Sequence, residues 1–428
     1  MSVNLAAHDV PAKTPARPVA EIARAHSIDP RIPALIPRFD APFFQAGLAG
    51  YSDGPMRLVA RRHGCPFCVT EALLDRTLIN GGKGRTREDP DLLAEECGTG
   101  DPEENRAAGL DDHPIAGQIM GTFSDEMAQG AAILASFGYD TIDVNLACPV
   151  KKVKRRNRGG HFLAQPDEAI EVLKAVREAV PREIPTTVKM RRAYDDTPEM
   201  ARAFERIFDA AYGLGYSWVT VHCRTVEQRY HGPGRWEFLI DLVRRYPERL
   251  IFGSGDIWAV EDIFSMLEIT GVQAVSVARG CIGNPWIFRQ ARQLMAGEEP
   301  SAPTLAQQRQ ALLEHFELSV SLHGERSASR MMRKFGIRFS AHHPDPELVK
   351  AQFIQCRSVD DWRSVLDRHY AVAARARPAD AMSVGKAPNQ TEMSLAGADA
   401  LRRDTRRAPS MTPAAPMNGV SQSDTGGC

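Results

Sequence analysis

A single cysteine stands between the end of a strand-like run and a basic loop in the stretch DVNLACPVKK, residues 143–152. An unperturbed thiol has a pKa of about 8.5, so Cys148 is mostly protonated at neutral pH and suits a proton donor. A nucleophilic cysteine would instead need a lowered pKa. The positive charges that follow favour the thiolate, and we expect them to point outward. Taken alone, such a cysteine is more often a small buried hydrophobe.

Polar or reactive residues also recur at the ends of the other strand-like runs. They are Gln118, Asn145, Lys189 and His222, followed by the turns GSGD (253–256) and ARG (278–280). Glycines let backbone N–H groups approach a phosphate, and Arg279 can pair with phosphate through two hydrogen bonds. A lysine at such a position would stabilise an anionic reduced flavin ring. Each residue alone is more often an ordinary polar rim residue, and GSGD is a common turn. Their recurrence at the same end of successive strands favours a phosphate-bearing flavin cofactor.

Eight β-rich runs must position these residues. They begin at Phe43, Phe67, Pro114, Thr141, Pro185, Ser217, Arg249 and Ala274. Amphipathic helical segments lie between most of them, with Pro, Asp or Thr at their starts and glycine at their ends. Eight strands that alternate with helices predict a (β/α)8 TIM barrel, a fold whose active sites lie at the carboxyl ends of the strands. The alternative is a doubly wound open sheet, but AGLAGYSDGP after the first strand lacks the G-x-G-x-x-G pattern.

The whole chain divides into four predicted parts. These are an N-terminal arm (1–40), the barrel (41–300), a small all-helical domain (301–372) and a tail (373–428). The arm is rich in Pro and Ala and is expected to be loose. The tail has no aromatic residue after Tyr370, so it cannot bury enough apolar surface to fold and is expected to be disordered. The long polar segment 75–112 is expected to be a lid or an RNA-facing loop.

Composition excludes several classes of protein. The 428 residues carry a formal net charge of -1, and no apolar run of about 18 residues predicts a membrane span. The N-terminus has no apolar core of the signal-peptide type. Eight widely spread cysteines favour free thiols in a reducing compartment, so a cytoplasmic location is expected. Cys65-x-x-Cys68 has no second pair at zinc-site spacing, so no metal is expected. Nothing indicates an obligate protein partner.

Seven sequence elements, taken in order, resemble the tRNA-dihydrouridine synthases of the bacterial, FMN-dependent type. They are LAGYSD, QIMG, DVNLACPVKKV, VKMR, VHCRT, GSGDI and ARGCIGNPWIF. The resemblance spans Phe43 to Tyr370, and the cysteine element is its most specific part. It implies an FMN-containing barrel and a helical tRNA-binding domain. It also implies reduction of the C5=C6 bond of specific uridines in tRNA, with NADPH as the reductant.

The resemblance implies a role for each matching residue. Cys148 would protonate uracil C5 while reduced FMN delivers hydride to C6. The residues implied in FMN binding are Gly47, Leu48, Ala49, Gln118, Asn145, Lys189, His222, Ser254, Gly255, Asp256, Ala278 and Arg279. The family usually has Pro-Met-Ala where this chain has Gly47-Leu48-Ala49, and we expect Gly47 to loosen that turn. The family also has glycine at the positions of Ala147 and Ala278, which is a mild departure.

Two basic clusters are predicted to bind tRNA, because a nearly neutral protein needs local charge to hold a polyanion. The clusters are Lys151, Lys152, Lys154, Arg155 and Arg156 after the cysteine, and Arg330, Arg333, Lys334 and Arg338 within about two helical turns. A bare charge run is otherwise a solvated surface. Two alternatives remain. One is an FMN-dependent oxidoreductase acting on a free pyrimidine, like dihydroorotate or dihydropyrimidine dehydrogenases. The other is a non-catalytic RNA-binding protein.

Overall fold

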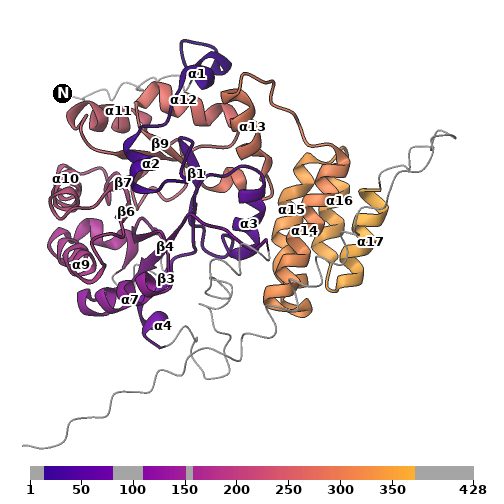
Figure 1. Cartoon of the computed structure of the whole chain (residues 1–428), viewed down its shortest axis with the longest axis horizontal. Coiled ribbons are helices and arrows are strands. Elements are labelled where there is room, and N and C mark those ends of the chain that lie inside the picture. Colours follow the sequence, from indigo (N-terminus) through magenta and orange to yellow (C-terminus); the bar gives the residue numbers. More distant parts are fainter. Residues whose placement is uncertain (1–13, 81–108, 151–157, 372–428) are drawn as a thin grey trace, which may run out of the picture.

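The protein folds into a parallel β-barrel beside a bundle of helices (Figure 1). The computed structural model describes residues 14–80, 109–150 and 158–371. Eight parallel strands close the barrel, and the last pairs with the first. They are β1 (Phe43–Gln45), β2 (Cys68–Val69), β4 (Ile115–Met120), β5 (Thr141–Leu146), β6 (Thr186–Arg191), β7 (Trp218–His222), β8 (Ile251–Ser254) and β9 (Ala274–Val277). A short segment, β3 (Leu73–Leu74), pairs with the end of β4. The predicted fold and all eight predicted strands are confirmed.

Helices alternate with the strands and cover the outside of the barrel (Figure 1). They are α3 (Gly54–Arg62), α4 (Asp75–Ile79), α7 (Ser124–Ser136), α9 (Pro166–Ala179), α10 (Pro198–Gly213), α11 (Trp236–Arg245), α12 (Val260–Thr270) and α13 (Trp286–Met295). Two short 3-10 helices, η1 (Gly159–Ala164) and η2 (Arg279–Cys281), lie in the connections after β5 and β9. Side-chain caps fix two helix starts, since Asp53 accepts from the Met56 amide and Thr197 from the Met200 amide.

Aromatic rings fill the amino-terminal half of the barrel. Phe39 stacks on Phe67 with ring centroids 4.7 Å apart, and Trp218 stacks on Phe252 at 5.0 Å. Phe44 packs edge-on against Phe39 and Phe67. All five side chains are buried. They form a packed floor, which leaves the opposite, carboxyl end of the barrel for a ligand.

The segment before β1 is ordered from residue 14, so the expectation of a loose arm is wrong for residues 14–40. It forms α1 (Val19–Ala25) and α2 (Arg31–Leu35). Helix α1 contacts α12 and α13 and buries Ile22 in the main core, and Ile32 of α2 is buried at the barrel floor. A few well-spaced apolar residues among Pro and Ala are enough to dock this segment, because each buried side chain contributes roughly 1.5–3 kcal/mol.

Four helices and a short 3-10 helix follow the barrel. They are α14 (Leu305–His323), α15 (Glu325–Phe339), η3 (Ser340–His342), α16 (Pro346–Gln355) and α17 (Val359–His369). Trp362 lies at their centre, 4.9 Å from the Phe316 ring and 4.8 Å from the Phe353 ring. The bundle lies against the α3 side of the barrel, with α14 in contact with α3 (Figure 1). Within the described residues, no helix is long and apolar enough to cross a membrane. The predicted tail, and most of the 75–112 insertion, lie outside the described residues.

Candidate active site

The carboxyl ends of neighbouring strands bring the predicted polar residues together. The register of β5 and β6 places Asn145 opposite Lys189, and that of β7 and β8 places His222 opposite Ser254. Because all the strands are parallel, these side chains share one end of the barrel. The strand-end pattern in the sequence therefore corresponds to one spatial site.

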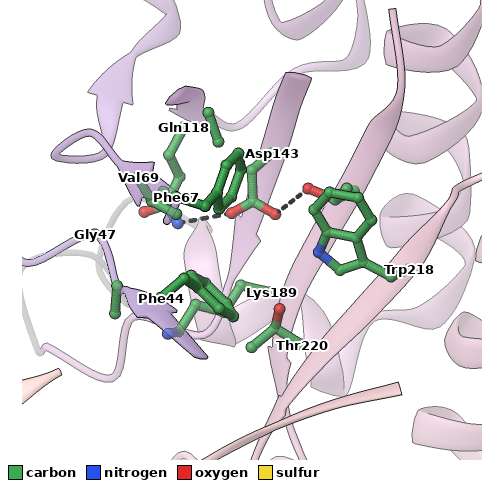
Figure 2. Close-up of a pocket in the computed structure, with 12 residues that line it drawn as sticks. Phe44, Gly47, Phe67, Val69, Gln118, Asp143, Lys189, Trp218 and Thr220 are labelled. Carbon is green, nitrogen blue, oxygen red and sulfur yellow. Dashed lines mark hydrogen bonds between the residues drawn. The ribbon is translucent and has the colours of Figure 1, made fainter. Parts of the chain in front are cut away.

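A chain of hydrogen bonds crosses the barrel interior beneath this site. Asn145 donates through Nδ2 to Gln118 Oε1 at 2.7 Å, and Gln118 donates through Nε2 to Asp143 Oδ2 at 2.7 Å. Thr187 donates to the other carboxylate oxygen of Asp143 at 2.6 Å. Figure 2 shows the Asp143 carboxylate directed at the Gln118 amide. An ionised carboxylate only accepts, so Asp143 fixes the orientation of the Gln118 amide and, through it, that of Asn145.

Lys189 reaches the same interior cavity from β6 (Figure 2). Its ammonium donates to the Ser276 hydroxyl at 3.2 Å. Burial lowers the pKa of Lys189 to about 8, while the Asp143 carboxylate raises it. The residue as a whole is half-buried, and the surrounding protein removes most of the water from its ammonium group. Burial also raises the pKa of Asp143. The site thus holds a cation beneath the barrel mouth, within electrostatic reach of a recessed carboxylate.

Asn145 also holds the turn that carries Cys148. Its Oδ1 atom accepts hydrogen bonds from the backbone amides of Ala147 at 3.0 Å and Cys148 at 3.1 Å. The thiol is half-buried, and burial raises its pKa, although the guanidinium groups of Arg191 and Arg158 act in the opposite direction. The net direction keeps Cys148 a neutral thiol near pH 7, which is the protonation state that a proton donor requires.

Arg191, at the end of β6, is a site residue to which sequence reasoning assigned no role. Its Nε donates to the Ala147 carbonyl at 2.8 Å, and its Nη1 donates to the carbonyls of Thr225 at 2.9 Å and Arg229 at 2.7 Å. Its guanidinium carbon lies 5.3 Å from the Tyr230 ring centroid. Arg191 therefore ties the cysteine turn to the loop after β7. The sequence signal for Arg191 was its position in the VKMR element, two residues after Lys189 and therefore on the same face of the strand.

His222 ends β7 as a neutral imidazole. Burial lowers its pKa well below the ordinary value, and the cations of Arg191, Lys189 and Arg224 lower it further. Its Nδ1 accepts a hydrogen bond from the Arg224 amide at 3.2 Å. The neutral ring can therefore offer Nε2–H as a donor to a ligand at the strand ends.

The GSGD turn after β8 is braced by its own aspartate. Asp256 forms an ion pair with Arg224 and accepts the Gly234 amide at 2.7 Å through Oδ2. Both Gly255 and Asp256 have positive φ, at 127° and 58°. The carboxylate of Asp256 therefore links the loops after β7 and β8, and contact with a ligand is left to the backbone of the turn.

Arg279 begins η2 after Ala278, which follows β9. Its guanidinium carbon lies 4.7 Å from the Tyr230 ring centroid and 4.6 Å from that of Trp258. No hydrogen bond or ion pair joins this guanidinium to any residue that the structure describes. A Cβ at Gly280 would lie 2.3 Å from the Ile257 carbonyl oxygen, so only glycine allows the two loops to approach. The donor edges of Arg279 suit a phosphate here.

The segment after β1 departs from the expectation of a looser turn. A Cβ at Gly47 would lie 2.4 Å from the Thr70 carbonyl oxygen, so glycine here permits a close approach of two segments of the backbone. Leu48 donates its amide to the Ser52 hydroxyl at 2.8 Å. Gly47 lines the interior cavity (Figure 2), whereas Ala49 is exposed. Tight backbone packing therefore holds this segment.

The structure describes only one of the two predicted basic clusters. The first, Lys151, Lys152, Lys154, Arg155 and Arg156, lies outside the described residues. On α15, Arg330 and Arg338 are exposed and Arg333 is half-buried. Lys334 instead donates to the Gly50 carbonyl, so it joins α15 to the segment after β1.

Cys65 and Cys68 are buried free thiols whose Sγ atoms lie 3.8 Å apart. The Cys65 thiol donates to the Phe67 carbonyl at 3.1 Å. Burial raises the pKa of Cys68 well above its ordinary value. Among the described residues, no group of three or more His, Cys, Asp or Glu side chains could hold a metal ion.

This chain is similar in sequence to known proteins and matches one family model. The family model described as "Dihydrouridine synthase (Dus)" matches residues 44–374, which include both the barrel and the helical bundle. A "Probable tRNA-dihydrouridine synthase" of Treponema pallidum (strain Nichols) is 33% identical over 298 residues, covering 68% of this chain and 82% of that protein. The "tRNA-dihydrouridine synthase B" of Pseudomonas putida (strain KT2440) is 30% identical over 310 residues, covering 72% of this chain and 85% of that protein.

Proposed function

Because this chain belongs to the dihydrouridine synthase family, we propose that it reduces the C5=C6 bond of specific uridines in tRNA to 5,6-dihydrouridine. FMN is the bound cofactor and NADPH the reductant. One observation carries the proposal. The side chain of Asn145 joins the Cys148 turn to the polar side chains of Gln118 and Asp143, so a proton donor and the candidate cofactor-binding residues form one connected unit.

The residues at the strand ends fit FMN. Lys189 offers a buried ammonium for an anionic ring, and the amides of Gln118 and Asn145 lie at the same end of the barrel. Arg279 offers donor edges to the phosphate, beside the backbone of Ser254, Gly255 and Ala278. Bound FMN, once reduced by NADPH, would supply the hydride for uracil C6. The pKa of Lys189 at about 8 leaves it mostly charged at neutral pH, which favours negative charge on the ring.

Cys148 supplies the proton for uracil C5 in this mechanism. Burial raises its pKa, so the sulfur carries its proton before the reaction. The Asn145 carboxamide, by accepting from the Cys148 amide at 3.1 Å, fixes the direction in which the side chain leaves the backbone. General acids of this kind contribute about 10²–10⁴-fold to a rate.

The helical bundle and the basic loop would bind the tRNA. A uridine must leave its stack to reach the barrel, at a cost of a few kcal/mol. Phosphate contacts made by Arg330 and Arg338 on α15, and by the lysines and arginines of 151–156, would offset that cost. Both described arginines are exposed, so their guanidinium groups are available to the backbone of an RNA.

The test incubates the purified protein with FMN, NADPH and tRNA that lacks dihydrouridine, and maps the modified positions. Dihydrouridine at one or a few positions supports the proposal. Parallel reactions with free uracil and with dihydroorotate separate the free-pyrimidine alternative. Turnover of a free pyrimidine without turnover of tRNA would overturn the proposal, and a protein that binds tRNA but takes up no flavin would favour the non-catalytic alternative.

A further inference from the structure

Trp258 differs from every other tryptophan in the chain. Four of the five are buried, with exposed fractions of at most 2%: Trp218, Trp236, Trp286 and Trp362. Trp258 is 50% exposed. It lies between β8 and α12, at the carboxyl end of the barrel where the candidate active site lies. Single exposed apolar side chains are ordinary on a protein surface, so it is the position of this ring at the mouth of the candidate site that bears on function.

The backbone of Trp258 is held rigidly. The amides of Trp258 and Ala259 both donate to the Asp262 carboxylate, at 2.8 Å and 2.9 Å. On the other side, a Cβ at Gly280 would lie 3.1 Å from the Trp258 Cα, so η2 packs directly on this segment. The exposed ring therefore has a fixed base, and little conformational entropy is left to lose when a ligand covers it.

Trp258 is also the last member of an alternating stack of cations and rings. The guanidinium carbon of Arg191 lies 5.3 Å from the Tyr230 ring centroid, and that of Arg279 lies 4.7 Å from the same ring and 4.6 Å from the Trp258 ring. Among the described residues, Arg279 is the only cation or ring recorded against Trp258. One part of the indole is thus covered by Arg279, and the outer part remains open.

The stack connects the cysteine turn to the basic helix of the bundle. At one end, Arg191 donates to the Ala147 carbonyl, next to Cys148. At the other end, a Cβ at Gly283 would lie 2.5 Å from the Arg338 Cβ on α15, so the segment that follows Arg279 and η2 packs directly on the basic helix. An RNA that placed a uridine at Cys148 and its backbone on α15 would pass the exposed face of Trp258.

We propose that the outer face of Trp258 stacks on an unpaired nucleobase of the bound tRNA other than the target uridine. The inference rests on the proposed function and adds a specific contact to it. Every base has a π face, so such a contact tolerates sequence, and base–aromatic stacking supplies affinity without a phosphate contact. It also helps to hold the RNA in the unstacked form that the reaction needs.

The test compares Trp258→Ala, Trp258→Phe and the wild-type holoprotein for tRNA affinity at two salt concentrations. We expect Trp258→Ala to weaken tRNA binding by about 5- to 150-fold, and Trp258→Phe to recover most of the loss because a phenyl ring also stacks. The slope of affinity against salt should stay the same, since no phosphate contact is lost. Phe137→Ala is the matched control, because Phe137 is a 39% exposed ring at the far end of α7. It should bind tRNA like the wild type.

Three results would overturn the inference. Equal tRNA affinity in Trp258→Ala and wild type would show that no base stacks there. A raised KM for NADPH with unchanged tRNA affinity would assign the ring to the nicotinamide nucleotide instead. Loss of FMN from Trp258→Ala would show that the ring acts on the cofactor through Arg279. Failure of the wild type to bind tRNA at all is a distinct outcome, which overturns the proposed function and this inference with it.

Discussion

The change Asp143→Asn removes one buried charge while keeping the shape of the side chain. The carboxylate now accepts from Gln118 at 2.7 Å and from Thr187 at 2.6 Å. An asparagine can still accept from Gln118 and can donate to the Thr187 hydroxyl, which both donates and accepts. The substitution therefore deletes the charge that acts on Lys189 and still allows a hydrogen bond to each partner, with the bond to Thr187 reversed.

The magnitude follows from the pKa of Lys189. Burial lowers it from 10.5 to about 8, and Asp143 raises it. Loss of a neighbouring opposite charge lowers such a pKa by a further one to three units, to about 5–7. Between the folded and unfolded pKa values, the unfolded chain binds one more proton. The free energy of unfolding therefore rises with pH by about 1.4 kcal/mol per unit across that interval. The rise begins near pH 8 in the wild type and one to three units lower in Asp143→Asn.

Urea unfolding at pH values from about 5 to about 10 measures this onset. Thr187→Val is the matched control, because it removes a hydrogen bond to Asp143 but keeps the charge, and its onset should stay near that of the wild type. Lys189→Met should abolish the rise altogether. Profiles for Asp143→Asn and the wild type that run parallel over the whole range would refute the electrostatic influence of Asp143 on Lys189.

The remaining predictions concern packing, cofactor and RNA. Gly47→Ala should lower the free energy of unfolding by about 1–3 kcal/mol because its Cβ meets a backbone carbonyl; an unchanged urea midpoint would contradict that close approach. Arg279→Ala should weaken FMN binding, measured by titration of flavin fluorescence, and an unchanged dissociation constant would remove Arg279 from the phosphate site. Replacing Lys152, Lys154 and Arg155 by alanine should weaken tRNA binding and reduce the log–log salt slope by about 0.7–0.9 per lost contact. FMN content should not change, and identical salt curves would make the loop a solvated surface.

The fold could be predicted because strand and helix periodicity are local properties of the sequence. Eight β-rich runs separated by helical segments have one natural closed arrangement, and each run became a barrel strand. The segment 14–40 was misjudged for a physical reason. Its composition is that of a loose arm, but Ile22 and Ile32 have docking surfaces on distant helices and strands, which composition does not reveal.

A residue of the candidate site could be predicted only where its position at the end of its own strand was enough to indicate a role. Lys189 and Asn145 met that condition. Asp143 was missed because it reads as an ordinary polar position within a strand, and its partners lie on β4 and β6. Arg191 was missed because the carbonyls that bind it belong to separate loops. Asp256 was grouped with a phosphate-binding turn, and nothing local indicates its ion pair with Arg224.

Two half-reactions of Cys148→Ala test the central claim most directly. Stopped-flow absorbance of the bound flavin follows its reduction by NADPH and then its reoxidation by tRNA that lacks dihydrouridine. The first step delivers no proton to uracil, so the variant should be reduced at the wild-type rate. The second step needs the thiol proton, so reoxidation by tRNA should slow by about 10²–10⁴-fold. Reoxidation of Cys148→Ala at the wild-type rate would contradict the account, because Cys148 would then be a packing residue and the proton would have another source.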